Sequence, residues 1–509
     1  MFSSKADSGN NKFHDYLLLL VLSILIILSS IWGLYNNNEE RFSDHGSAYE
    51  GAYRILKGQL PYRDFFIPTG PVVYYIQALF NYFFGLNLTA VAMLTAFMAI
   101  LVCGYFFYTL RKSFNKLIGF IFAYSLFFAF CGMIYFPFHN LSAMFFLLLN
   151  LLVLINHKSV NMKMILLSMF LCMLSFFSKQ DTGLLQILFI GLYILLFSKE
   201  KIKNLSCFYP GLTVFICIII IFFNRTGDFF YSFNVFQEPF YSRVSFISTT
   251  LGLIWILKTT QFYLVLFSVL LWFIKSYQNK RESILILFGI NLITLIVFIT
   301  SSTGDQTIVE QIPLSLFLIF QIFEDNLKVL FKKSKILSLL IIIMSVIYLK
   351  PIASAFFHLI KVTLKSPSYT RIVEGSYKGL SFSPLLLSDL NKIRSILNNQ
   401  KDFLGITGYQ FLYTDYNIEP PKPMPLWFDY GITFRKNGVY LLVEYIRRES
   451  PKIILINEEF CTDYDTKELS ISSLKELGYQ LIFSTYASNK AGGELIRVLE
   501  LTNDKNIAS

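Results

Sequence analysis

Long apolar runs alternate with short polar segments through the first 350 residues of the chain. Many runs approach the ~20 residues that an α-helix needs to cross the hydrocarbon layer of a bilayer. They lack the every-second-residue alternation of barrel strands, so the pattern predicts membrane-spanning helices. About eleven spans are expected, at residues 16–34, 88–110, 117–134, 141–156, 164–178, 183–198, 208–223, 255–274, 284–300, 308–323 and 336–350.

The pattern changes after about residue 366. Ser383-Pro384 is typical of a helix N-cap followed by proline at the first helical position, and predicts a helix towards Asn399. Residues 452–457 and 480–484 have the pattern of buried strands, with a helix through 473–477 between them. Proline-rich residues 420–425 predict a rigid, extended connector.

Composition agrees with a lipid environment for most of the chain. Hydrophobic residues make up 54% and charged residues only 15%, whereas soluble proteins are about one quarter charged. The predicted fold class is therefore an α-helical polytopic membrane protein with a C-terminal α/β domain. We place the membrane domain at residues 1–350 and the soluble domain at residues 351–509.

Basic residues recur in every second loop, in the groups 111–116, 158–163, 199–203, 275–281 and 328–335. The alternate short loops hold a single basic residue, Lys179. By the positive-inside rule the basic loops and the N-terminus are cytoplasmic, and residues 35–87 and 351–509 are extracytoplasmic. The first run lacks a clear cleavage site and is interpreted as a retained helix. A bacterial cytoplasmic membrane is the expected location.

The excess of positive charge is a topology signal rather than a nucleic-acid site, because it lies in these short loops. The chain also lacks HExxH, Walker A and zinc-ligand spacings. Its six cysteines form no CxxC motif. We therefore expect no cofactor and no nucleic-acid partner, while the need for a divalent metal stays open.

Charge gathers in the first extracytoplasmic loop, where Asp44-His45-Gly46 is followed by Glu50, Arg54 and Pro61-Tyr62-Arg63-Asp64. The next stretch, residues 72–84, is apolar and aromatic and suits a helix at the membrane interface. Together, residues 44–85 resemble the first loop of GT-C fold glycosyltransferases. These enzymes use polyprenyl-phosphate sugars and include protein O-mannosyltransferases and the lipid A aminoarabinose transferase. Beyond these residues the resemblance extends only to the helix layout of residues 1–350.

The resemblance implies a catalytic role for Asp44, since in the family the loop aspartate is the proposed general base. A sugar on a lipid phosphate already has a good leaving group, so one carboxylate that accepts the acceptor's proton is sufficient. His45 replaces the family's second acid and is predicted to bind substrate or to orient Asp44. The alternative for each residue is a solvated position at the membrane surface.

Further candidate substrate-binding residues lie in the same loop and in later ones. The family places a lysine against the lipid phosphate at the turn that here reads Ser178-Lys179-Gln180-Asp181, which makes Lys179 the candidate phosphate ligand. A local pair between Lys179 and Asp181 is the alternative, because charges at this depth need a partner or a function. His139 lies where the family often has a second acid and is predicted to replace it, with a purely structural histidine as the alternative. The other assigned residues are Arg63, Asp64, Asp181 and Arg243.

These observations predict a membrane glycosyltransferase that moves a sugar from a polyprenyl-phosphate donor to a glycan, lipid or protein acceptor at the outer face of the membrane. Two alternatives stay open. A transporter or flippase of lipid-linked glycans usually shows inverted repeats and charges at mid-membrane, and no repeat is found here. A polysaccharide polymerase or ligase typically carries its large charged loop late in the chain.

Overall fold

The computed structural model describes residues 10–35, 42–67, 69–112, 116–131, 139–157, 159–226, 249, 256–257, 259–300, 312–333, 370–372, 381–382, 384–397, 400, 402–406, 412–426, 436–457, 469–487 and 494–502. The chain divides into two compact units. Unit 1 comprises Met1–Ile31, Met93–Ile220 and Pro239–Lys361. Unit 2 comprises Trp32–Ala92, Ile221–Glu238 and Val362–Ser509. The first loop therefore belongs to the same compact unit as the C-terminal residues, although more than 300 residues separate them in the sequence.

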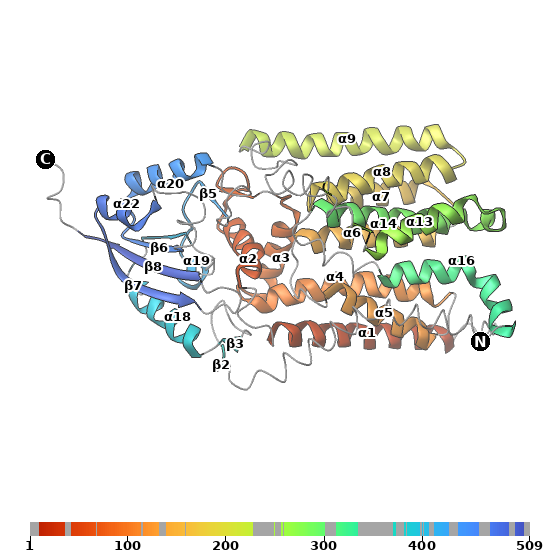
Figure 1. Cartoon of the computed structure of the whole chain (residues 1–509), viewed down its shortest axis with the longest axis horizontal. Helices are drawn as coiled ribbons and strands as arrows, with labels where there is room; N and C mark the ends of the chain where they lie inside the picture. The colour runs from red at the N-terminus through yellow and green to blue at the C-terminus, as the bar shows by residue number, and fades with distance from the viewer. Residues whose placement is uncertain are drawn as a thin grey trace. The chain divides into compact units, whose positions relative to one another are not determined.

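Unit 1 is built from helices (Figure 1). Three of them, α1, α4 and α9, continue at one end into unit 2. The described helices are α1 (Asn10–Tyr35), α4 (Leu88–Leu110), α5 (Lys116–Cys131), α6 (His139–Asn156), α7 (Met162–Phe176), α8 (Gln180–Phe197), α9 (Lys201–Thr226), α13 (Thr260–Phe273), η2 (Lys275–Lys280), α14 (Arg281–Thr300) and α16 (Ile312–Lys333).

Five of the described helices are long and apolar enough to cross a membrane. They contain the segments Phe13–Gly33, Leu88–Leu110, His139–Asn156, Gln180–Phe197 and Lys201–Arg225. The chain is accordingly an integral membrane protein. The predicted runs at 88–110 and 141–156 coincide with α4 and α6. The run at 336–350 lies outside the described residues, and the total of about eleven spans stays a prediction.

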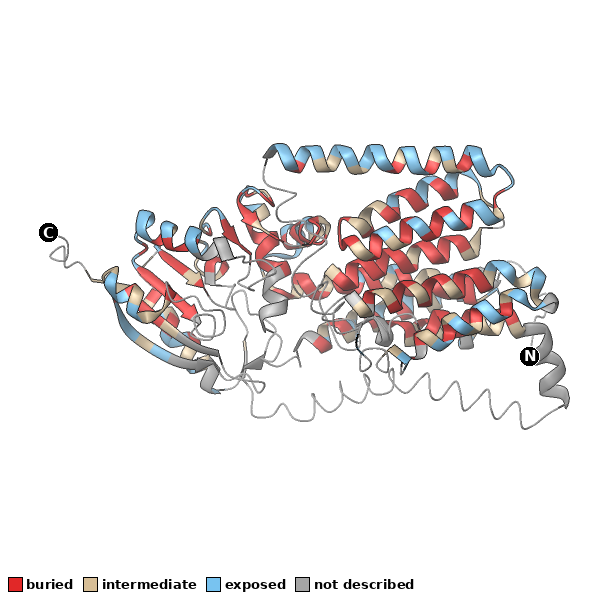
Figure 2. Ribbon diagram, turned by 45° about the horizontal axis from the view of Figure 1, so that its top comes forward, coloured by how far each residue is buried: buried red, intermediate tan, exposed pale blue. Residues whose placement is uncertain are grey.

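Burial separates the interior helices of unit 1 from the peripheral ones. Within its apolar window α6 is 78% buried, whereas α9 is only 11% buried, and Figure 2 shows α9 exposed along most of its length. Buried amides join neighbouring helices: Asn150 donates to the Ser168 carbonyl, and Asn291 lies 3.2 Å from the Ser315 hydroxyl. Such contacts hold helices together where lipid gives no hydrophobic driving force between them.

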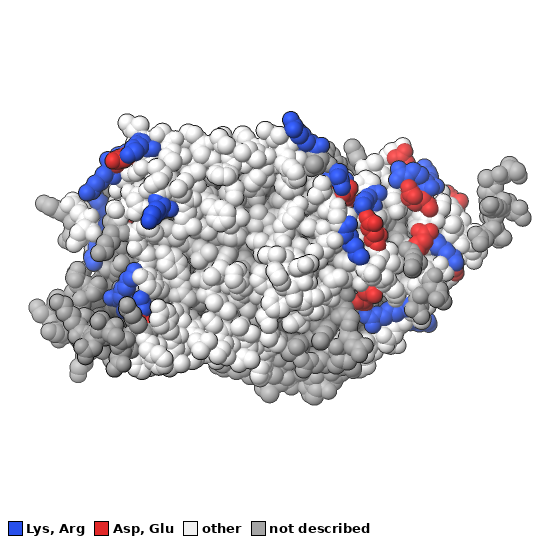
Figure 3. Space-filling view, turned by 180° about the vertical axis from the view of Figure 1, so that it is seen from behind, with Lys and Arg blue, Asp and Glu red and all other residues white. Residues whose placement is uncertain are grey.

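On the face shown in Figure 3, the exposed charged side chains of unit 1 gather at one end of the helix bundle, beside a broad surface without them. The sequence explains this distribution. Arg111 and Lys112 directly follow α4, Lys199 lies between α8 and α9, and Lys201 is the first residue of α9. Asp15 of α1 forms ion pairs with Arg111 and Lys116 at the same group of helix ends. The orientation of this end towards the cytoplasm stays a prediction.

Unit 2 contains a four-stranded mixed sheet in the order β4-β6-β8-β7, within the described residues. Strands β4 and β6 are parallel, and the other neighbours are antiparallel. The predicted helix after Ser383 is present as α18, and the two predicted strands are present as β6 and β7. The elements are α18 (Pro384–Leu397), β4 (Phe403–Ile406), α19 (Leu412–Asp415), α20 (Lys436–Glu449), β6 (Ile453–Asn457), α22 (Ile471–Glu476), β7 (Tyr479–Ala487) and β8 (Glu494–Leu501). A further pair, β2 (Thr370–Arg371) and β3 (Ser381–Phe382), is antiparallel.

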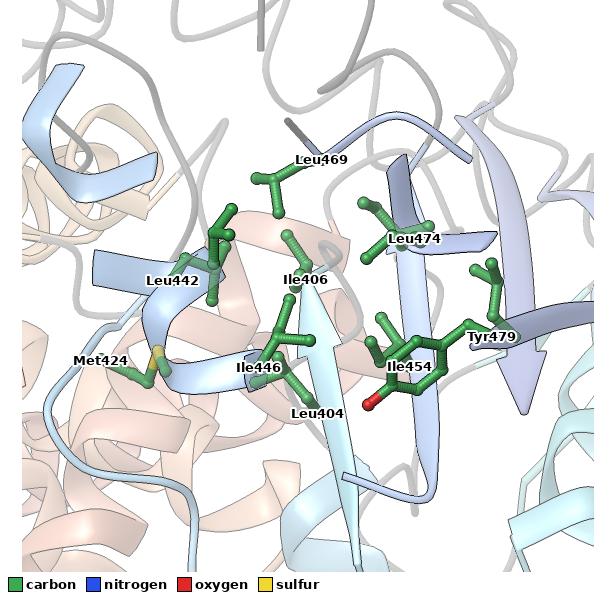
Figure 4. Close-up of a cluster of buried hydrophobic side chains, with 12 residues drawn as sticks. Leu404, Ile406, Met424, Leu442, Ile446, Ile454, Leu469, Leu474 and Tyr479 are labelled. Atoms are coloured by element: carbon green, nitrogen blue, oxygen red, sulfur yellow. The ribbon is translucent and has the colours of Figure 1, made fainter. Parts of the chain in front are cut away.

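One face of this sheet carries an apolar core (Figure 4). Leu404 and Ile406 of β4 meet Leu442 and Ile446 of α20, and all four are almost completely buried. The same cluster includes Met424, Ile454, Leu474 and Tyr479. The β4–α20–β6 arrangement is the crossover that a parallel strand pair requires.

The first loop supplies a further part of unit 2. It forms the helices α2 (Phe42–Leu56) and α3 (Val72–Phe84), with the short strand β1 (Phe65–Phe66) between them. The predicted interface helix at residues 72–84 matches α3, whereas α2 was not predicted. Strand β1 pairs in parallel with β5 (Met424–Pro425), which lies in the predicted 420–425 connector.

Candidate functional site

The candidate catalytic residue Asp44 lies in the first turn of α2. Its neighbour His45 follows on the same turn. The side chains of both residues fall outside the described part of the structure, so their roles stay predictions. What the structure provides is the backbone that carries them, and the contacts that hold the rest of this helix.

Helix α2 is buried on all sides from Ala48 to Arg54. Ala48, Tyr49, Ala52 and Tyr53 are 0 to 2% exposed. Gly51 allows this close approach, because a Cβ there would lie 2.4 Å from the Tyr74 ring of α3. Any larger side chain would displace the Tyr74 ring.

A buried ion pair lies on the same helix. Arg54 Nε lies 3.3 Å from Glu50 Oε1 in an i,i+4 arrangement, and both side chains are less than 5% exposed. Burial raises the pKa of Glu50 from 4.5 to about 7, although the charge and hydrogen bond of Arg54 act in the opposite direction. Desolvation therefore outweighs the attraction within this pair.

Helix α2 leads into a tight turn that contains the Pro61–Asp64 motif. Gly58 ends the helix with a φ of 80°, a conformation that suits glycine at this position. Tyr62 has a φ of 66°, which is rare for a bulky residue. Its hydroxyl donates to the Thr69 carbonyl at 2.7 Å, and its backbone N–H donates to the Phe65 carbonyl at 2.8 Å. These bonds hold the chain in the unusual conformation.

The carboxylate of Asp64 is engaged within the turn. It accepts two hydrogen bonds from Arg63, at 2.9 and 2.5 Å, and one from the backbone N–H of Leu60 at 2.8 Å. Burial alone would raise the pKa of Asp64, but the bonds from Arg63 and Leu60 lower it below its usual value. Asp64 is therefore ionised and shapes the turn, and its assignment to substrate binding stays a prediction.

The second group of candidate residues lies in unit 1, at the turn between α7 and α8. Lys179 precedes the first residue of α8, and its Nζ lies 3.3 Å from Oδ2 of Asp181. Oδ1 of Asp181 accepts from the Thr182 N–H at 2.5 Å. Gly183 makes the tight turn possible, since a Cβ there would lie 2.2 Å from Cα of Phe176.

The local pair between Lys179 and Asp181 is thus present, as one of the two interpretations of the sequence expected. It does not exclude the other. A helix N-terminus is the positive end of the helix dipole and favours anions. The ammonium group of Lys179 is mostly buried beside it, with 11% of the side chain exposed. The helix N-terminus and the Lys179 ammonium group both attract a phosphate group at this turn, whereas the carboxylate of Asp181 repels it.

His139 belongs to the same neighbourhood. It is the first residue of α6, and the charge of Lys179 acts on its ring, so the two side chains lie within electrostatic reach of each other. The structure therefore brings together three predicted residues from two separate loops: His139, Lys179 and Asp181. Arg243 lies outside the described residues.

Sequence reasoning missed the Glu50–Arg54 pair as a structural feature. A signal was available, because opposite charges four residues apart face each other on a helix. Gly58 also follows at a suitable distance for a helix end. Among the residues that the structure describes, no three His, Cys, Asp or Glu side chains lie close enough to hold a metal.

Comparison with known proteins identified one family. Residues 68–223 match the family described as dolichyl-phosphate-mannose-protein mannosyltransferase. The resemblance found in the sequence is thereby confirmed over this range. The matched range contains His139, Lys179 and Asp181, whereas the Asp44–Asp64 part of the first loop precedes it and Arg243 follows it. A search of curated proteins found no match.

Two crystal structures of ArnT from Cupriavidus metallidurans are similar to this chain. The structure in the apo state has 10% sequence identity and a TM-score of 0.48, over 97% of this chain and 99% of ArnT. The structure bound to undecaprenyl phosphate has 10% identity and a TM-score of 0.45, over 95% and 98% of the two chains. Both TM-scores are below 0.5, where a likeness is too weak to assign function.

Proposed function

We propose that this chain is a membrane glycosyltransferase that transfers a sugar from a polyprenyl-phosphate donor to an acceptor at the outer face of the membrane. The match of residues 68–223 to a family that uses dolichyl-phosphate mannose carries this proposal. The acceptor hydroxyl attacks the anomeric carbon, and the bond between that carbon and the phosphate oxygen breaks. Polyprenyl phosphate leaves with the electron pair, and Asp44 accepts the proton of the hydroxyl.

Lys179 contacts the donor phosphate in this proposal. Its buried ammonium group at the start of α8 supports the assignment, since both the cation and the helix dipole favour a phosphate. Asp181 pairs with Lys179, and His139 lies within electrostatic reach of the Lys179 ammonium group. His45, Arg63, Asp64 and Arg243 remain candidate ligands of the sugar or the acceptor.

The test of function uses cells that lack this chain. If the chain is a glycosyltransferase, mass spectrometry of these cells should show that one polyprenyl-phosphate sugar accumulates. It should also show that one surface glycan, lipid or protein loses a sugar. The purified protein should then transfer the sugar from that lipid to the acceptor. A flippase would instead move the intact lipid-linked glycan between the leaflets of a vesicle without breaking the bond to phosphate. That result would overturn the proposal.

The site also requires one orientation in the membrane. A reporter that is active only outside the cytoplasm should be active after Ser509 and silent near Lys201. The grouping of the first loop and the C-terminal residues in one compact unit supports a common side for both. The opposite reporter pattern would place Asp44 in the cytoplasm and contradict transfer at the outer face.

A further inference from the structure

A segment of the C-terminal part, residues 413–426, lies against α2 and the turn that follows it. We call it the clamp segment. Three loop side chains donate to its backbone carbonyls: Tyr53 Oη to Ile418 O at 2.9 Å, Gln59 Nε2 to Pro420 O at 2.8 Å, and Arg54 Nη1 to Pro421 O at 3.4 Å. Gln59 is completely buried and Arg54 is 3% exposed. Buried donors of this kind are costly to leave without acceptors.

Backbone pairing extends the contact along the turn. The Met424 N–H donates to Asp64 O at 3.4 Å, and the Leu426 N–H donates to Phe66 O at 3.0 Å. These bonds form the parallel β1–β5 pair. Leu426 also packs on α2, since a Cβ at Gly51 would lie 3.1 Å from its Cδ2 atom. The clamp segment thus contacts both the helix and the turn.

The other side of the clamp segment is fixed in the C-terminal core. Met424 is part of the apolar cluster that includes Leu404 and Ile406 of β4. The Tyr413 ring stacks on Phe403 at 4.9 Å, and its hydroxyl accepts from the Gly405 N–H at 2.8 Å. The clamp segment therefore connects α2 to the C-terminal sheet, so the position of the sheet helps to determine the position of α2.

From these contacts we infer that the C-terminal part positions α2 for catalysis, with Arg54 and Gln59 as positioning residues. The inference rests on the proposed function, because it assigns the purpose of the clamp to Asp44. Asp44 lies on the same helix as Arg54, about 15 Å away at the rise of 1.5 Å per residue. A helix fixed firmly at one end determines where its other end lies. A misplacement of about 1 Å in a reacting group can reduce a rate about hundredfold.

The decisive variant is Gln59→Leu, which removes the donor to Pro420 at nearly constant size. The matched control is Gln480→Leu, the same substitution at an exposed position of β7. Both are made in the full-length protein in nanodiscs. Hydrogen exchange of the amides in α2 measures how firmly the helix is held. Single-turnover transfer is measured with the lipid-linked sugars extracted from cells that lack the chain.

Gln59→Leu should speed exchange in α2 and in the clamp segment but leave α8 unchanged. Its transfer rate at saturating donor should fall about tenfold to hundredfold, with the half-saturating donor concentration within about twofold of wild type. The control should match wild type in all three measurements. If Gln59→Leu does not fold, Arg54→Lys replaces it. Arg54→Lys keeps the positive charge beside Glu50, but the shorter side chain no longer extends to the Pro421 carbonyl.

Asp44→Asn in the same assay separates the two proposals. If Asp44→Asn transfers at the wild-type rate, the assignment of the base is wrong whatever Gln59→Leu does. If Asp44→Asn is inactive while Gln59→Leu loosens α2 without slowing transfer, the clamp is a structural contact only and the inference is overturned. Unchanged exchange in α2 of Gln59→Leu would overturn it as well.

Discussion

Two regions of the molecule each hold a cation beside a carboxylate, and they use the pair differently. In the first loop, Arg54 and Glu50 are both buried and Arg54 also donates to a backbone carbonyl. In the turn before α8, the Lys179 and Asp181 side chains are 11% and 21% exposed. A guanidinium can bind several oxygens at once in fixed directions, whereas an ammonium is a compact charge that can turn towards a new partner. The first arrangement suits a structural joint, and the second suits a ligand that arrives from outside.

The largest effect on the transfer rate is expected at Asp44. In the proposal this residue takes part in the reaction, whereas Glu50 and Asp64 shape the first loop. Asp44→Asn keeps the size of the side chain but removes the basic oxygen. General-base catalysis typically contributes ~10²–10⁴-fold in rate. We expect single-turnover transfer to fall by that factor while expression and donor binding persist. Glu50→Gln and Asp64→Asn should slow the chemical step less. An equal loss of transfer rate in all three variants would mean that Asp44 has no special role among the carboxylates of the loop.

The next effect concerns the pH dependence of stability at Glu50. A carboxyl group with a raised pKa in the folded state contributes stability at low pH, and this is lost as the pH rises to the folded pKa. For Glu50 this window runs from 4.5 to about 7, because burial raises its pKa. The melting temperature of the wild type should therefore fall more steeply from about pH 5 to pH 8 than that of Glu50→Gln. Parallel curves would show that Glu50 is not desolvated.

A smaller effect is expected at Lys179. Because its pair with Asp181 is more exposed than the pair of Arg54 and Glu50, we expect a change at Lys179 to alter donor binding rather than stability. A hydrogen bond to a charged group contributes about 1.5–3 kcal/mol, or roughly tenfold to hundredfold in affinity. Lys179→Ala should weaken binding of the proposed polyprenyl-phosphate donor by such a factor, and Lys179→Arg should retain part of that affinity. The exposed Lys203, which pairs with Glu200, offers Lys203→Ala as the control. Equal binding by wild type and Lys179→Ala would reduce Lys179 to a local ion pair.

The smallest effect should come from Lys57, at the solvent-exposed edge of the clamp. Its Nζ donates to Asn417 Oδ1 at 2.7 Å. Exposed contacts usually contribute within about 0.5 kcal/mol of stability. Lys57→Ala should therefore leave both the melting temperature and hydrogen exchange in α2 nearly unchanged. If Lys57→Ala speeds hydrogen exchange in α2 as much as Gln59→Leu does, then exposed and buried contacts of the clamp segment are equally important for holding the helix.

The sequence predicted the apolar helices well, because hydrophobic length decides whether a segment enters a bilayer. The run at 88–110 has the same bounds as α4. Local signals also predicted α18 from its Ser-Pro start, and β6 from its buried apolar run. Such elements depend mainly on residues close to them in the chain.

Elements that depend on distant partners could not be predicted in the same way. Helix α2 contains polar residues throughout, and it is covered by α3 and by the clamp segment, both of which lie elsewhere in the sequence. The motif at residues 61–64 suggested substrate binding, but the contacts of Asp64 depend on the positive φ of Tyr62 and on β5. In the candidate site, the turn at Lys179 and Asp181 was predicted with its pair, since those two residues are close in sequence.

The contact between α2 and the clamp segment has a consequence for the order of events during synthesis. Tyr53 and Ile418 are 365 residues apart in the chain. At the usual 5–20 residues per second, about 20 to 70 s pass between the synthesis of the two partners. Throughout that interval the buried donors of α2 have no final acceptors, although most of the apolar helices have already been made. A nascent chain that stops before residue 413 therefore leaves the ribosome with the contacts of this helix incomplete, because the segment that completes them is translated more than 300 residues later.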